Sequence, residues 1–555
     1  MSALDNLWSK HGFLSFPIDC DAVLKHLKQD MRDDWFADVL GYRDLFAQKA
    51  DLQKVLAELL AEGNGQYLGE QRQLCDVPKK GLGLRYALET DFYDRFVYQA
   101  ICSFLIKYYD PLLSTRVFGH RWNPRDKNGR YLFKSRIELW QTFEGITYAS
   151  LAGEEVLLAT DLINYFENIS IEMIKEAFLS KIPSINASGQ EKLQIRNSVL
   201  TLCALLERWS YSDRHGLPQN RDASSFIANV VLSGVDHKMV ELGYDYFRYV
   251  DDIRIVCSDS RRARKALSEL IAQLRVVGMN INSSKTAILE AVEDERVSEF
   301  FPAVDSRTLA IDGMWKSRSR RVIARSVPLV CKMISELIEA GDSQSRQFRF
   351  AVNRMKILLE SDIFIASSSA ASGLVALVLD ALETQAVSTD QFCRILSLLD
   401  MSPQELRRVE AFLLDSVVSI HSWQNYHLWM LLALKKYESD AIIDLARRKV
   451  SAHIRSPEVP AIFVYLSVVG KGEDVLEEAI LSFASDWPFQ HQRYLLLATK
   501  DFGRESLSLI YGKVGVRFRG TVRRARSHIQ EAGTLVRLPE ALSLLSIYDE
   551  ISVYD

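Results

Sequence analysis

The sequence has few cysteines, and they are not arranged in pairs. Seven cysteines are scattered over 555 residues, and no two of them form a CxxC motif. An odd and dispersed set argues against a structural zinc site and against a disulfide framework. We therefore expect a reducing compartment and a cytoplasmic location.

Long apolar runs and an excess of positive charge are also missing. The best apolar run, residues 373–384, is too short to span a bilayer and contains Asp380. The first residues, MSALDNLWSKHGF, lack the basic-then-apolar order of a signal peptide. We therefore expect no membrane partner. The net charge of -4 gives no global signal for nucleic-acid binding, so a surface of that kind must be local.

The chain is long enough for two to four domains, and its predicted secondary structure changes twice along the sequence. Residues 1–65 read as a helical extension, residues 66–315 mix strand and helix signals, and residues 316–555 read as amphipathic helices. We expect an all-α, helical-repeat-like domain in this last part. Helices are predicted at 402–415, where Ser402, Pro403 and Glu405 form a start signal, and at 438–450, 472–483 and 539–550.

Three aspartates follow apolar, strand-like runs in the middle part. Asp161 follows the run EVLLAT, and Asp251 and Asp252 stand side by side in a predicted hairpin, residues 246–258. Helices are predicted at 190–212 and 223–242. Alone, the Asp-Asp pair would be a polar turn, and Asp161 could be the N-cap of a helix over 162–169. Together they could converge on one point, where repulsion is tolerable if Mg²⁺ ions are bound. Two such ions, about 4 Å apart, stabilise both the attacking and the leaving oxygen in phosphoryl transfer.

These motifs resemble those of reverse transcriptases. Residues 249–252 (YVDD) resemble the family's YxDD box, and Asp161 lies in a match to its first metal-binding motif. Further matches in the expected order are the fingers motif at 77–101, an FR-containing box at 118–124, an LPQG-like box at 215–232 and a GLxLxxxKT-like motif at 276–286. The resemblance covers about residues 70–290 and implies right-hand fingers and palm, an α+β fold.

The resemblance assigns roles residue by residue. It implies that Asp161, Asp251 and Asp252 are the catalytic acids and bind two Mg²⁺ ions, with Mn²⁺ as an alternative. It implies dNTPs as substrates, with Phe166 as the steric gate against ribose. The other residues implied to contact the nucleotide are Lys79, Lys80, Arg85, Gln219 and Lys285. From the residues alone, Phe166 could instead be a helix core residue, the lysines at 79–80 a solvated turn, and Lys285 a surface lysine.

The sequence also departs from the family pattern. Asn220 stands where the family has glycine after Gln219, and a helical region follows residue 290 in place of the usual thumb signatures. This combination resembles the abortive-infection branch of the bacterial "unknown group" reverse transcriptases. That resemblance implies phage defence, a homo-oligomer, and DNA synthesis that is protein-primed and non-templated, with product DNA and a non-coding or template RNA as partners.

Two other hypotheses remain open at this point. One is a scaffold on a reverse-transcriptase fold that senses phage nucleic acid or protein; the intact set of three aspartates argues against it. The other is a conventional templated enzyme of the retron or intron kind, against which Asn220 and the helical region argue. Basic stretches at 316–325 and 513–530 fit either a nucleic-acid contact or a solvated surface.

Overall fold

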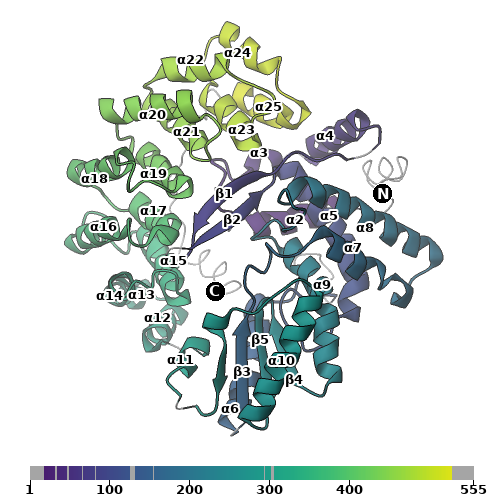
Figure 1. Ribbon diagram of the computed structural model, residues 1–555. Coiled ribbons are helices and arrows are strands. Elements are labelled where there is room, and N and C mark those ends of the chain that lie inside the picture. The colour runs from purple at the N-terminus through teal and green to yellow at the C-terminus, as the bar shows by residue number, and fades with distance from the viewer. Residues whose placement is uncertain are drawn as a thin grey trace. The chain divides into compact units, whose positions relative to one another are not determined.

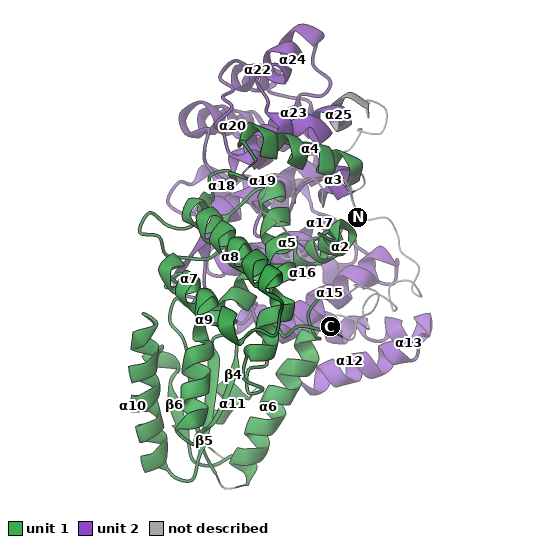
Figure 2. Cartoon of the chain, turned by 90° about the vertical axis from the view of Figure 1, so that its right-hand side faces the viewer, with its two compact units in different colours: residues 1–34, 48–74, 88–303 green, residues 35–47, 75–87, 304–555 purple. Residues whose placement is uncertain are grey.

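The structure is a computed structural model in which two compact units can be described. It describes residues 18–31, 34–46, 49–65, 67–81, 83–124, 132–153, 155–292, 294–301 and 305–527. Unit 1 comprises residues 1–34, 48–74 and 88–303, and unit 2 comprises residues 35–47, 75–87 and 304–555 (Figure 2). The helix predicted at 539–550 and the first residues of the chain lie outside the described parts.

Unit 1 is built around a four-stranded antiparallel sheet. Its strands are β3 (Val156–Asp161), β4 (Asp245–Tyr249), β5 (Asp252–Cys257) and β6 (Ala287–Leu289), in the order β4-β5-β3-β6. The predicted hairpin is confirmed, because β4 and β5 pair directly and Val250 and Asp251 form their turn. All six residues of β3 are buried, which explains its nearly continuous apolar sequence.

Helices cover both faces of this sheet. Helix α6 (Arg136–Ala152) packs on the face that carries Leu157, Phe247 and Leu289. Because side chains alternate along a strand, Leu158 points to the other face. Helices α9 (Asp222–Glu241) and α10 (Ser260–Val276) contact each other and the sheet on that side (Figure 2).

The other helices of unit 1 confirm two predictions and correct one. Helices predicted at 190–212 and 223–242 are α8 (Gly189–Trp209) and α9. The N-cap role for Asp161 is wrong, because residues 162–169 form turns and the next helix is capped by Ser170. The remaining elements are α2 (Cys20–Asp30), α4 (Lys49–Glu62), α5 (Phe92–Tyr109), α7 (Ile171–Leu179) and α11 (Val297–Phe300).

Unit 2 is a stack of helix pairs, which confirms the predicted helical C-terminal region. Two rows run side by side, each helix contacting the next in its own row (Figure 1). The predicted capping box of Ser402 and Glu405 starts helix α18. One row is α14 (Val327–Glu339), α16 (Ser369–Ala381), α18 (Pro403–Leu414), α20 (Asp440–His453), α22 (Glu473–Leu481) and α24 (Arg504–Tyr511). The other is α15 (Arg346–Glu360), α17 (Thr389–Leu398), α19 (Ser422–Lys435), α21 (Val459–Val469), α23 (Phe489–Ala498) and α25 (Arg519–Ser527), with α12 (Ser306–Lys316) and α13 (Arg320–Ala324) before them.

Two early stretches of chain complete unit 2. One is residues 35–47 with α3 (Arg43–Phe46), and the other is most of the hairpin β1 (Gln73–Pro78) and β2 (Leu84–Glu89). Arg493 of α23 is fully buried and binds Asp38 and Asp44 through both sides of its guanidinium group. The indole of Trp423 donates to the main-chain oxygen of Trp35 at 2.7 Å. The second row of helices therefore holds residues 35–47 as a bound peptide segment.

No helix in the described part of the chain combines the length and apolar character needed to cross a bilayer. All seven cysteines lie in described residues, and none of them forms a disulfide.

Candidate active site

The three predicted catalytic aspartates meet at one end of the unit 1 sheet. Asp161 is the last residue of β3, and it lies opposite Asp252, the first residue of β5, in the strand register. Asp251 lies in the β4-β5 turn, and its main-chain oxygen accepts a hydrogen bond from the amide of Leu162 at 3.2 Å. The structure thus brings together three carboxylates that are separated by up to about ninety residues in the sequence.

The carboxylates perturb one another because they are close and partly buried. Burial, followed by the charges of Asp252 and Asp161, raises the pKa of Asp251 to about 8. Asp161 is 8% exposed, and its Oδ1 has no hydrogen-bond partner among the described residues. A cluster of this kind is stable in its ionised form only beside a cation.

Lys285 already provides one cation. Its Nζ lies 2.6 Å from Oδ2 of Asp161. Burial lowers the pKa of Lys285, but the hydrogen bond and charge of Asp161 raise it by more, so that the ammonium form is favoured. The lysine side chain is 64% exposed, so this pair can open at little cost.

The residues present fit a divalent metal ion. The donor set consists of carboxylate oxygens, the ligands that Mg²⁺ prefers, and one buried oxygen of Asp161 lacks a partner. The position that Lys285 takes shows that Asp161 attracts a positive charge. Asp161, Asp251 and Asp252 are the residues that would hold the metal, which when bound polarises phosphate oxygens and neutralises charge that develops on them.

The turn that carries Asp251 has a strained backbone. Val250 has a φ of 55°, a left-handed conformation that is unfavourable for a β-branched residue. A Cβ atom on Gly119 would lie 2.8 Å from Cγ2 of Val250 and 3.0 Å from its nitrogen, so only glycine fits there. The box at 118–124 therefore supports the turn directly.

A buried polar network in the core of unit 1 holds this turn in place. Arg248 and Asp236 are fully buried and form a two-point ion pair, with two contacts of 2.8 Å. The same guanidinium group donates to Oδ1 of Asn229 at 2.9 Å and to the main-chain oxygen of Val250 at 2.8 Å. Tyr246 donates to Asp236 at 2.9 Å. Arg248 thus connects the core of unit 1 to the residue before Asp251.

The predicted nucleotide residues Phe166 and Gln219 lie on neighbouring segments. The amide of Leu217 donates to the main-chain oxygen of Phe166 at 3.0 Å, and Gln219 donates to Glu167 at 3.3 Å. Phe166 is half-buried in the turn segment after β3, so it is not a helix core residue. Asn220 has a φ of 57°, a conformation that asparagine tolerates better than most residues, which explains how it can replace the family's glycine.

A ring of four buried charges holds the start of α9 beside this segment. The side chains of Arg95 and Arg221 each bind both Asp34 and Glu89. The two positive and two negative charges compensate one another, which makes their burial tolerable. This ring fixes the main chain immediately after Asn220.

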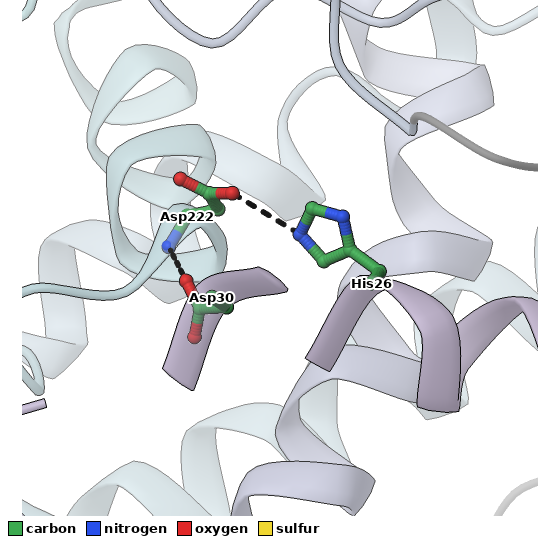
Figure 3. Close-up of side chains that lie close together, drawn as sticks. All are labelled: His26, Asp30 and Asp222. Carbon is green, nitrogen blue, oxygen red and sulfur yellow. Dashed lines mark hydrogen bonds and ion pairs between the residues drawn. The ribbon is translucent and has the colours of Figure 1, made fainter. Parts of the chain in front are cut away.

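A second cluster lies at the next residue, Asp222 (Figure 3). Nε2 of His26 lies 3.2 Å from one of its carboxylate oxygens, an ion-pair contact, and Nε2 of His120 is hydrogen-bonded to the other at 3.0 Å. The amide of Asp222 donates to Asp30 at 2.9 Å. Burial would raise the pKa of Asp222, but the two histidines lower it well below its usual value. One ligand atom each of His26, Asp30 and Asp222 lies within 4.8 Å of the others, the spacing of a metal site. Because a hydrogen bond and an ion-pair contact already join these groups, we assign them to fastening α2 to α9.

The remaining predicted nucleotide residues, Lys79, Lys80 and Arg85, belong to unit 2. They flank the β1-β2 turn, which is closed by a hydrogen bond of 2.7 Å from the amide of Lys79 to the main-chain oxygen of Gly83. Lys80 pairs with Asp342 at 3.1 Å, and the guanidinium of Arg85 lies 5.5 Å from the ring centre of Trp35.

Sequence reasoning missed Arg248, Asp236 and Gly119. The available signal was the charged residue Arg248 inside an otherwise apolar strand, because a charge in such a run is buried and needs a partner. The partner itself could not be identified, since Asp236 is one of several polar residues in α9.

Comparison with known proteins identifies the domain. Residues 95–350 match the family model described as "Reverse transcriptase (RNA-dependent DNA polymerase)". Similar solved structures include telomerase from Candida tropicalis with a TWJ fragment of telomeric RNA, at 11% identity and a TM-score of 0.29, covering 62% of this chain and 68% of that chain. Apo telomerase from the same organism has 12% identity and a TM-score of 0.28, covering 83% and 74%. Telomerase from Candida albicans with the TWJ fragment has 12% identity and a TM-score of 0.28, covering 75% and 65%.

The search of curated proteins gave no match. The family match confirms the resemblance to reverse transcriptases over the matched residues. The chain carries a reverse-transcriptase domain followed by a helical region, and it is a nucleotide-polymerising enzyme.

Proposed function

We propose that this enzyme is a DNA polymerase that adds dNTPs by two-metal phosphoryl transfer. The observation that carries the proposal is the meeting of Asp161, Asp251 and Asp252 at the ends of neighbouring strands, with a lysine ammonium on one of them. Mg²⁺ is the ion that best suits these oxygen donors, and Mn²⁺ is an alternative. Without bound cations these three carboxylates would repel one another.

We assign the nucleotide contacts as the resemblance to reverse transcriptases implies them. Phe166 is proposed as the gate that excludes the ribose 2′-hydroxyl, and Gln219 as a contact to the incoming nucleotide. Lys285 would act near the leaving pyrophosphate, because its side chain is exposed and can leave Asp161. The triphosphate is assigned to Arg85 and to Lys79 or Lys80, because their cationic groups suit phosphate oxygens.

We further propose that synthesis is protein-primed and needs no template. The residues after the polymerase motifs form stacked helix pairs, and Asn220 adds a side chain where the family has none. An enzyme that binds a duplex weakly needs another way to retain the growing end of its DNA product. A covalent link to a protein hydroxyl meets that need, since tethering makes each addition intramolecular.

The wider assignment follows the resemblance to the abortive-infection branch. We propose a polymerase core at residues 66–315, a preceding helical extension, and a helical domain at 316–555. The protein would act in the cytoplasm as a homo-oligomer in defence against phage. Its nucleic-acid partners would be the product DNA and a non-coding RNA.

The test is to incubate the purified protein with single labelled dNTPs, with and without added RNA. We expect incorporation without RNA, and labelled DNA that stays with denatured protein until protease is added. The Asp251→Asn protein is the control for background label. Free DNA with an ordinary 5′ end, made only when RNA is present, would contradict this priming mechanism and favour the templated, retron-like alternative.

A sensing scaffold is the second candidate, and one observation favours it. In unit 2, side-chain donors bind main-chain oxygens of residues 35–37, including Tyr426 to Ala37 at 2.8 Å. A helical stack that binds one peptide segment has the chemistry to bind another. Full phage protection by a folded Asp251→Asn protein would support this role over synthesis.

A further inference from the structure

Unit 2 contains a cavity of about 360 Å³ to which the polymerase reaction assigns no role. It lies where α15 ends at Glu360 and where α17 ends at Leu398. Its apolar lining includes Leu359, Phe364 and Leu398, and Ile365, 65% exposed, lies on its surface side. A cavity of this size with apolar walls and a few polar groups is typical of a small-ligand site.

The polar lining of the cavity favours positive charge. It contains three carboxylates, those of Glu360, Asp362 and Asp400, and one ammonium group, that of Lys435. The ends of α15 and α17 add the partial negative charge of a helix C-terminus. Lys435 shows what this environment binds, because its Nζ donates to the main-chain oxygens of Ser397 at 3.0 Å and Leu399 at 2.5 Å.

Glu360 is buried and only partly compensated. The residue is 7% exposed, and within the described residues its Oε1 accepts no hydrogen bond. The ammonium of Lys356, one turn earlier on α15, forms an ion pair with this oxygen at 3.6 Å, a distance too long for a hydrogen bond. Arg320 donates to the main-chain oxygen of Asp362 at 3.1 Å. Neither of these two cations lines the cavity.

A buried carboxylate oxygen that accepts no hydrogen bond lowers the stability of the folded protein unless a bound donor compensates for its desolvation. Burial raises the pKa of Glu360, and its interaction with Lys356 offsets only part of this effect. A ligand that brings a charged donor into the cavity would remove the penalty. Its apolar part would lie against Leu359, Phe364 and Leu398.

We propose that this cavity binds an organic cation, a primary ammonium or guanidinium group on an aliphatic stem. The charged head would contact Glu360, and the stem would fill the apolar part. Such a cation could be a free amine or the lysine or arginine side chain of another protein, since both carry the same chemistry.

The test uses saturation-transfer NMR on the full-length protein with n-pentylammonium, and with 1-pentanol as the neutral probe of similar shape. We expect a clear signal for the ammonium and affinity for pentanol lower by about tenfold or more, because a charge-assisted hydrogen bond is lost. Glu360→Gln should abolish the preference for the cation. Glu383→Gln, which removes an exposed carboxylate of unit 2 outside the cavity, should leave it unchanged.

Ile365→Trp gives an independent variant, because the residue is exposed and a larger ring should fill the cavity mouth without disturbing the fold. It should also prevent binding. The same signal in wild type and both cavity variants, or equal affinity for ammonium and alcohol, would overturn the proposal. An acetylated Gly-Arg-Gly amide, compared with n-pentylguanidinium, separates the two sources: tighter peptide binding indicates a protein side chain, and tighter binding of the free cation indicates a small molecule.

Discussion

Replacing Arg248 with methionine tests whether the buried network holds the catalytic turn. Methionine keeps most of the side-chain volume but removes the charge that Asp236 needs, and both residues are fully buried. Breaking a buried ion pair by removing one partner destabilises a protein by about 3–5 kcal/mol. For a unit of this size that corresponds to a decrease in Tm of roughly 6 to 20 °C.

The same change should reduce activity by more than unfolding explains. Arg248 donates to the main-chain oxygen of Val250, whose left-handed backbone costs about 1–3 kcal/mol to maintain. Without that bond the turn can relax and move Asp251 away from Asp161 and Asp252. A displacement of about 1 Å at a reacting centre can reduce the rate about 100-fold.

The assay measures dNTP incorporation per folded molecule at a temperature well below the variant's Tm, with the folded fraction determined by circular dichroism. Arg296→Met is the matched control, because Arg296 also pairs with an aspartate, Asp294 at 2.7 Å, but is half exposed. That change should cost about 1 kcal/mol or less and leave activity unchanged. If Arg248→Met had the same Tm as the control, or kept full activity when folded, the positioning role would be refuted.

Three further changes address other parts of the site. Asp251→Asn should abolish incorporation without lowering Tm, because it removes a metal ligand and relieves repulsion; retained activity would exclude Asp251 as a ligand. Phe166→Ala should increase rNTP use relative to dNTP use by roughly 10- to 200-fold, measured by competition, and an unchanged ratio would exclude the gate. Asp30→Asn removes a carboxyl group whose pKa is raised to about 6 by burial and by Asp222. Since the folded pKa exceeds the unfolded one, this carboxyl group stabilises wild type most below about pH 4, and that contribution is lost as the pH rises through about 6. In urea unfolding the variant should therefore gain stability relative to wild type between about pH 4 and about pH 6.5.

Local patterns in the sequence were sufficient for the elements that carry the acids. The apolar run before Asp161 predicted β3, and the alternation around Asp251 and Asp252 predicted the β4-β5 hairpin. Both signals depend on residues that are close in sequence, as does the capping box that starts α18. The motifs also predicted that the three acids meet at one end of the sheet. The strand register explains this meeting, because it sets Asp161 opposite Asp252.

Contacts between distant residues could not be predicted in this way. The assignment of residues 35–47 to unit 2 depends on bonds such as that from Trp423 to Trp35, which are 388 residues apart. No periodicity within either segment indicates the other. The left-handed conformation of Val250 was likewise hidden, because valine disfavours it and the close approach of Gly119 and the hydrogen bond from Arg248 become visible only in the folded structure.

The strain at Val250 bears on the choice between a polymerase and a scaffold. A left-handed β-branched residue persists only where its surroundings hold it firmly, and such residues gather at functional sites. Here a glycine that cannot carry a side chain, a buried ion pair and a strand bridge between Val117 and Arg248 all converge on one turn. A sheet that served only as a scaffold could relax this turn and gain stability. The turn aims Asp251 toward Asp161 and Asp252, so the strain is explained by the need to hold three carboxylates in one fixed arrangement.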